Sequence, residues 1–200
     1  MDTDSVGAST IVRDTAMEEE SICCEAVTVE DQIGRLEVVT ERYNLEGYLS
    51  NISSVEINDI PTEQLLSKDG LNILRSKLTP EQDSEFLREG ILVQHNGKSL
   101  YLDKYHFNSV PFVVKKGDEY VGSARLIIKN GYGLPTTNDP RIEISKIWEE
   151  KAKDCSAEFS QFAIRKGAPM DTSVKLLKAA YDYSRKNNLM GWLATTDNKV

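Results

Sequence analysis

The spacing of hydrophobic residues along the chain changes near residue 90. Before this point, residues 29–49 and 62–78 show helical spacing that single glycines interrupt. The stretch 79–90 predicts a firmer helix, because it begins with a Thr-Pro pair that suits the first turn and ends on glycine. Together these segments predict a helical N-terminal region over residues 29–90.

Strand-like spacing begins after residue 90. The stretch "ILVQHNGKSLYL" (91–102) places β-forming residues on both sides of Asn96 and Gly97, the pair that a type I′ hairpin turn favours. Residues 110–128 repeat this pattern, with two apolar runs around a Lys-Gly-Asp turn. We therefore expect an antiparallel sheet between residues 91 and 128.

The last third of the chain predicts a strand, a helix and a second strand. Residues 157–165 alternate as a strand, residues 172–188 keep apolar side chains on one helical face, and residues 191–197 begin another strand. A right-handed crossover makes these two strands parallel neighbours. The order of elements predicts an α+β fold, a mixed and mostly antiparallel sheet flanked by helices, with its main domain over residues 91–200. Because the sequence stops shortly after the last strand, we expect C-terminal strands of this domain to be missing.

The negative charge of the chain is concentrated at one end. The net charge is −8, and residues 1–30 hold eight acidic residues and one basic residue. Residues 1–28 are also polar and poor in aromatic residues, which predicts a disordered acidic tail. The rest of the chain is nearly neutral, which argues against a nucleic-acid partner, since phosphate binding favours a basic surface.

Cysteine and histidine are too sparse to indicate a metal site or a disulfide framework. The three cysteines have neither spacing, so we expect reduced thiols and a cytoplasmic location. His95 and His106 are the only histidines, and we expect both at the surface rather than on a metal. No stretch is long and apolar enough to predict a transmembrane segment.

The strand "AEFSQFAIR" carries the most unusual polar residues. Strict alternation predicts one face with Glu158, Ser160, Phe162 and Ile164 and the other with Ala157, Phe159, Gln161 and Ala163. A carboxylate in an apolar strand needs a partner, and Arg125 on a neighbouring strand would supply one. Two interpretations stay open at this point. Glu158 and Arg125 form either a structural ion pair or a strand end at the surface, or they form a general base with a charged neighbour in a cleft, the arrangement that acyl transfer to an amine requires.

Four short motifs over residues 101–197 resemble one family in order and spacing. They are Asp103, "VGSARL" (121–126), "LP" (134–135) and "EFSQFAI" (158–164). This set is similar to the acyl-homoserine-lactone (autoinducer) synthase family and its relatives, the long-chain N-acyl amino acid synthases. The resemblance implies a GNAT-like acyltransferase fold, whose sheet is splayed open where the pantetheine arm of the acyl donor inserts.

The resemblance also implies roles for individual residues. Glu158 and Arg125 would be catalytic, with Glu158 as the base and Arg125 binding the acceptor carboxylate or orienting Glu158. The substrate-binding residues would be Asp103, Ser160, Gln161, Phe162 and Ala163. The donor would be an acyl thioester on acyl carrier protein or coenzyme A, used as a substrate without a permanently bound cofactor, and the acceptor would be the amine of an amino acid. Basic side chains expected to meet an acidic carrier protein are Lys115, Lys116, Arg165, Lys166, Lys175 and Lys178.

Three departures from the family pattern narrow the expected reaction. Tyr101 and His106 stand where the family has acids, and Gln161 stands where it has arginine. These departures favour the wider N-acyltransferase class over homoserine-lactone synthesis. Two alternatives remain: a catalytically inactive GNAT-like domain that binds an acyl group or lipid, and an α+β interaction domain whose likeness to the family is due to chance.

Overall fold

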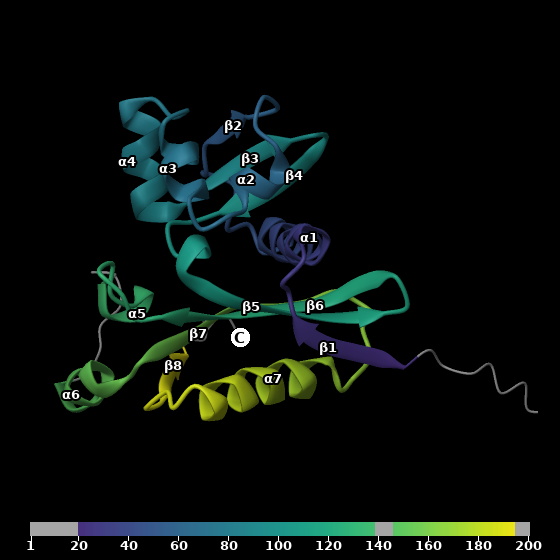
Figure 1. Cartoon of the computed structure of the whole chain (residues 1–200), viewed down its shortest axis with the longest axis vertical. Helices are drawn as coiled ribbons and strands as arrows, with labels where there is room; N and C mark the ends of the chain where they lie inside the picture. The colour runs from purple at the N-terminus through teal and green to yellow at the C-terminus, as the bar shows by residue number, and fades with distance from the viewer. Residues whose placement is uncertain (1–19, 139–145, 195–200) are drawn as a thin grey trace, which may run out of the picture.

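A computed structural model describes residues 20–138 and 146–194 of the chain (Figure 1). Its strands are β1 (Ser21–Glu25), β2 (Ser54–Glu56), β3 (Ile91–His95), β4 (Lys98–Leu102), β5 (Ser109–Lys116), β6 (Glu119–Ile128), β7 (Ala157–Ile164) and β8 (Trp192–Ala194). Its helices are α1 (Val29–Leu45), α2 (Thr62–Leu65), α3 (Gly70–Arg75), α4 (Pro80–Glu89), α5 (Pro135–Asn138), α6 (Lys146–Asp154) and α7 (Thr172–Lys186), with a short 3-10 turn at His106–Asn108. These elements form two sheets, with α1 between them.

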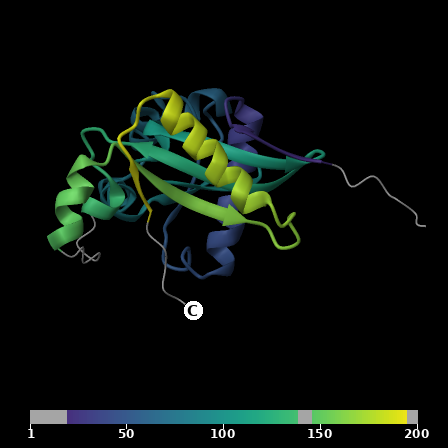
Figure 2. The ribbon, with the colours of Figure 1, turned by 90° about the horizontal axis from the view of Figure 1, so that it is seen from below.

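The larger sheet has five strands in the order β1-β5-β6-β7-β8. Its strands pair antiparallel except for β7 and β8, which are parallel and joined through α7. This arrangement confirms the expected hairpin over residues 110–128, its pairing with the strand at 157–165, and the strand-helix-strand crossover. Figure 2 shows α7 lying across one face of this sheet, where Leu176 and Ala180 contribute to its apolar core.

The smaller sheet contains β2, β3 and β4 and packs against the short helices of the N-terminal half. Asn96 and Gly97 both have positive φ angles, as a type I′ turn requires, so the predicted hairpin at 91–102 is confirmed. The expectation of one continuous sheet from 91 to 128 is wrong. The turn at His106–Asn108 separates the two hairpins, and β3 pairs instead with β2 from the region expected to be helical.

Local features of two helices show why these segments fold as they do. In α4, the side chain of Thr79 accepts from the backbone N–H of Gln82, and the side chain of Gln82 accepts from the backbone N–H of Thr79. Gly90 ends the helix with a φ of 87°. In α1, Gly34 leaves room for the ring of Tyr120, which lies 2.3 Å from where a Cβ would stand. The glycine that weakens α1 in the sequence therefore allows β6 to pack closely against it.

The N-terminal segment is not disordered as far as residue 28. Residues 21–25 form β1, which pairs with β5 along its whole length, and Ala26 is buried. The backbone of β5 would otherwise be an open edge, and Lys175 on α7 adds hydrogen bonds to Ser21. The predicted tail before residue 20 and the end of the last predicted strand, after residue 194, lie outside the described residues. None of the described helices is both long and apolar enough to cross a lipid bilayer.

Candidate active site

A cleft of about 1090 Å³ runs between the helices of the N-terminal half and the larger sheet. Its wall includes the C-terminal part of α1, the end of α4, the beginning of α5 and the strand β7. Six of the seven residues predicted to act or bind substrate line it: Asp103, Arg125, Glu158, Ser160, Gln161 and Phe162. The seventh, Ala163, packs against Val38 and Val39 of α1 instead.

A bulge in β7 determines which side chains reach the cleft. The pairing with β6 shifts between Ser123 and Arg125, so that two residues, Gln161 and Phe162, lie opposite one. Gln161 has a φ of 50°, in the left-handed region that non-glycine residues rarely adopt. The bulge breaks the strict alternation expected from the sequence. Ser160 and Gln161 both take part in the polar network of the cleft, whereas Gln161 was expected to share the face of Phe159.

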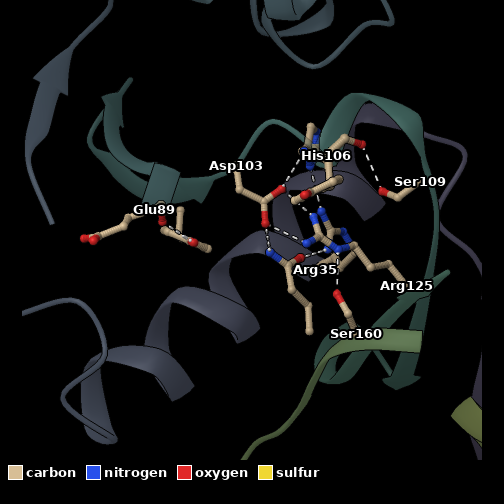
Figure 3. A network of polar contacts seen from close by, with 10 residues as sticks. Arg35, Glu89, Asp103, His106, Ser109, Arg125 and Ser160 are labelled. Atoms are coloured by element: carbon tan, nitrogen blue, oxygen red, sulfur yellow. Dashed lines mark hydrogen bonds and ion pairs between the residues drawn. The ribbon is translucent and has the colours of Figure 1, made fainter. Parts of the chain in front are cut away.

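Arg125 lies on β6 opposite Ser160 and is 2% exposed. Its two terminal nitrogens donate to the two carboxylate oxygens of Asp103, at 2.8 and 2.6 Å, and its Nε donates to Ser160 Oγ at 3.0 Å (Figure 3). Burial works to lower the pKa of Arg125, but the carboxylate of Asp103 outweighs it and holds that pKa above its ordinary value. The expected ion pair between Arg125 and Glu158 is therefore wrong, because Asp103 takes both ends of the guanidinium.

Glu158 occupies a different environment in the same cleft. It lies on β7 opposite Ile127 and is only 1% exposed. Its Oε2 accepts a hydrogen bond from the backbone N–H of Thr136 at 2.8 Å. Burial raises the pKa of Glu158, and the hydrogen bonding of Thr136 and the charge of Arg125 offset this only in part. No cation among the described residues forms an ion pair with it. The pKa of Glu158 is therefore higher than that of an ordinary glutamate.

Two buried residues that the sequence did not assign to the site complete its polar network. Arg35 on α1 donates to Gln161 Oε1 at 2.7 Å and contacts His106 Nδ1 at 2.8 Å. A guanidinium can only donate, so Nδ1 accepts and the proton of the neutral ring is on Nε2. Burial, with the nearby charge of Arg35, holds the pKa of His106 well below its ordinary value.

The expectation that both histidines lie at the surface is therefore wrong, since His95 is buried as well. A weak signal for Arg35 was present in the sequence. Arg35 falls on the same helical face as Asp31, Val38 and Val39, all of which are buried in α1. A lone arginine on a buried face needs acceptors from elsewhere in the chain, but helical periodicity alone does not identify them.

The family model of the N-acyl amino acid synthase FeeM matches residues 83–199, more than half of the chain. The chain belongs to the N-acyl amino acid synthase family. It is therefore an acyltransferase, and the likeness of its motifs to this group of enzymes is not due to chance. The matched region contains Asp103, Arg125 and Glu158, whereas Arg35 lies outside it.

The fold of the chain is similar to that of a solved structure from the same family. The structure of FeeM, an N-acyl amino acid synthase from uncultured soil microbes, superposes with a TM-score of 0.52 at 12% sequence identity. The match covers 90% of this chain and 73% of the other chain. The α+β, GNAT-like fold expected from the sequence is thus confirmed. No curated protein sequence matches the chain.

Most of the basic side chains expected to meet a carrier protein form ion pairs with acidic residues of the same chain. Four of the six form ion pairs: Lys115 with Asp31, Arg165 with Glu41, Lys175 with Asp171, and Lys178 with Asp182. Lys116 and Lys166 form no ion pair with an acid among the described residues. The surface around α7 is therefore less basic than its lysine content suggests.

Proposed function

We propose that this synthase transfers an acyl group from a thioester donor to the amine of an amino acid, with Glu158 as the general base. The observation that carries this proposal is the state of Glu158. It is a buried carboxyl group in a large cleft, held by one backbone N–H, with a raised pKa and no ion-pair partner among the described residues. A carboxylate of this kind is able to accept a proton from a substrate.

The acceptor amine is mostly protonated at neutral pH and must lose a proton before it attacks. Glu158, directly or through a water molecule, removes this proton, and the nitrogen lone pair then attacks the thioester carbonyl carbon. The carbon–sulfur bond breaks, the nitrogen loses its second proton, and the thiolate leaves and takes up a proton. The products are an amide and a free thiol, and no external oxidant or reductant is needed.

The strand β7 offers a place for the thioester carbonyl. Among the described residues, β8 pairs only with Ala157, Glu158 and Phe159, so the part of β7 beyond Phe159 has no strand partner on that side. Backbone N–H groups near Phe162 would hold the carbonyl oxygen as negative charge develops on it. A well-placed donor of this kind is worth about 2.7–4 kcal/mol in the transition state.

Arg125 is better suited to organise the cleft than to bind substrate alone. Its contacts with Asp103 and Ser160 fix the guanidinium, which leaves fewer N–H groups for an acceptor carboxylate. We propose that the rigid Arg125–Asp103 pair supplies a fixed dipole beside Glu158. Each N–H of Arg125 that remains free would bind the acceptor carboxylate.

The loop between β7 and α7 favours a carrier-protein donor over coenzyme A. A helix N-terminus normally attracts phosphate groups, but the residue that immediately precedes α7 is Asp171, whose carboxylate forms an ion pair with Lys175 at 2.9 Å. A carboxylate at this position would repel the pyrophosphate of coenzyme A.

The three cysteines form no disulfide, which agrees with the reducing cytoplasm that we propose as the location of the protein.

A reconstituted reaction tests this proposal. The purified chain is incubated with one long-chain acyl group presented either on acyl carrier protein or on coenzyme A, together with a mixture of amino acids. Mass spectrometry identifies N-acyl products, and a thiol reagent measures release of the donor thiol. We expect amide formation and faster turnover with the carrier protein. Thiol release without any N-acyl product, or no reaction with either donor, would overturn the proposal.

A further inference from the structure

Arg35 is fully buried and comes from a part of the chain far from the proposed catalytic residues. Its guanidinium bridges Gln161 on β7 and His106 in the turn before β5, and its Nε has no hydrogen-bond partner among the described residues. Burial, with the nearby charge of Arg125, lowers the pKa of Arg35 to about 9, and Asp103 offsets this only in part; no described carboxylate forms an ion pair with Arg35. Burying a charged group in this way is costly, so its retention needs an explanation.

The residue that Arg35 contacts on β7 has a strained backbone. Gln161 is not glycine, yet it adopts a φ of 50° at the bulge. Such a conformation persists only where the surrounding structure holds it. The Gln161 side chain has two hydrogen-bond partners: Arg35 at 2.7 Å, and Asp103 at 3.5 Å, which is too long for a strong bond. The short, charge-assisted bond from Arg35 is therefore the main restraint on this side chain.

The stretch of β7 around Gln161 forms part of the cleft wall. Ser160, Gln161 and Phe162 all line the cleft, and Ser160 also holds Arg125. Arg35 itself does not line the cleft, and its direct hydrogen bond to a residue of the cleft wall is the one to Gln161. Figure 3 shows Arg35 between His106 and the cluster around Arg125.

We propose that Arg35 is a positioning residue for acyl transfer, which holds Gln161 in the left-handed conformation and so fixes the part of β7 that lines the cleft. This inference rests on the proposed function, because the stretch of β7 that it concerns is the one proposed to hold the thioester carbonyl. The contact with His106 keeps the far side of the guanidinium in place, so that the nitrogen facing Gln161 has a fixed direction.

A rescue experiment separates this role from simple stabilisation. Glycine adopts positive φ angles without strain, so the clamp should be dispensable once residue 161 is glycine. Arg35→Met keeps the length of the side chain and removes the buried charge. We expect this substitution to lower kcat by about 10²-fold in the wild-type background, since small displacements of catalytic groups have effects of this size. KM for donor and acceptor should change much less.

The same substitution is then made in a Gln161→Gly background. We expect Arg35→Met to cause only a small further loss of kcat there, measured against Gln161→Gly alone. Arg35→Lys, which keeps the charge but cannot bridge Gln161 and His106 together, serves as the second variant. It should behave like Arg35→Met in both backgrounds, and it replaces that variant if Arg35→Met does not fold.

Crystal structures of the folded variants provide a readout independent of activity. We expect residue 161 to leave the left-handed region in Arg35→Met and to remain there in the variant that also carries Gln161→Gly. An equal loss of kcat in both backgrounds, or an unchanged bulge in Arg35→Met, would overturn the inference. If the wild-type chain shows no acyl transfer, the proposed function fails, while the conformation of residue 161 still decides whether Arg35 acts as a clamp.

Discussion

Two corners of one cleft hold carboxyl groups in opposite states. At the first corner, both oxygens of Asp103 accept from Arg125, and one also accepts from the backbone N–H of Tyr105. At the second corner, Glu158 has a single backbone donor from Thr136. Burial works to raise the pKa of Asp103, but the charge of Arg125 outweighs it and lowers that pKa, whereas burial raises the pKa of Glu158 and the hydrogen bonding of Thr136 and the charge of Arg125 offset this only in part.

This difference indicates which carboxyl group is available for chemistry. The charge of Arg125 stabilises the ionised form of Asp103, so Asp103 is poorly suited to accept a proton. Glu158 is buried and forms no ion pair among the described residues, and the charge of Arg125 offsets its burial only in part, so protonation relieves its unfavourable burial. A general base needs this second property. If Glu158 is the base that we propose, the Asp103 corner is structural and the Glu158 corner catalytic, so equivalent amide substitutions at the two positions should give opposite results.

Glu158→Gln should have the largest effect on activity. Glutamine keeps the size of the side chain and the acceptor for Thr136 but cannot take a proton, so we expect kcat to fall by about 10²–10⁴-fold. The melting temperature should be no lower than that of the wild type, because the substitution removes a buried charge. Single-turnover acyl transfer and a thermal melt on the same preparation measure both effects. A large loss of stability with unchanged activity per folded molecule would remove Glu158 from the active site.

Asp103→Asn should mainly affect stability. Asparagine is again similar in size, but the substitution leaves the buried Arg125 without its anion, and breaking a buried ion pair costs about 3–5 kcal/mol. Urea denaturation of wild type and variant gives the difference in the free energy of unfolding. Activity per folded molecule should fall less than in Glu158→Gln. A variant as stable as the wild type would show that the Asp103 corner is not structural.

The stability change caused by each of the two substitutions should depend on pH in opposite ways. These effects should be smaller than the losses of activity and stability predicted above. The folded pKa of Glu158 is raised, so its stabilising contribution is complete at low pH and is lost as pH rises through that pKa. The folded pKa of Asp103 is lowered, so its contribution is present at neutral pH and is lost as pH falls through that pKa. Thermal melts against pH should therefore show the gain from Glu158→Gln growing as pH rises, and the penalty of Asp103→Asn shrinking in acid.

The rate of acyl transfer provides a further readout of the same difference. The acid limb of the kcat/KM profile should lie above the ordinary pKa of glutamate, because the free enzyme must have Glu158 ionised. A limb at or below the ordinary glutamate value would contradict the state assigned to Glu158.

The sequence predicted the elements of the fold better than the contacts within the site. Local signals such as Asn96-Gly97 and the Thr-Pro start of α4 act over a few residues, and the structure confirms both. Local signals do not define how strands group into sheets. The two hairpins therefore separate into different sheets, although their sequences suggest one.

Long-range geometry explains the errors at the site. The motifs brought Arg125 and Glu158 to the same cleft, but their pairing depends on strand register, which places Ser160 opposite Arg125. The bulge at Gln161 also has no glycine to indicate it, because a side chain from α1 holds it. The segment at 21–25 lies in a stretch that is polar and acidic as a whole, and as a strand it pairs with the edge of β5.

The position of α1 has a consequence for how the protein folds during synthesis. This helix contacts β4 of the smaller sheet and β5, β6 and β7 of the larger one (Figure 1). Arg35 and its acceptor Gln161 are 126 residues apart in the chain. At about 5–20 residues per second, roughly 6–25 s separate their synthesis. During that time the N-terminal half can assemble, but the guanidinium of Arg35 has no acceptor on β7. The cleft can therefore close only after β7 has been made, and its closure depends on contacts of high sequence separation, which form slowly.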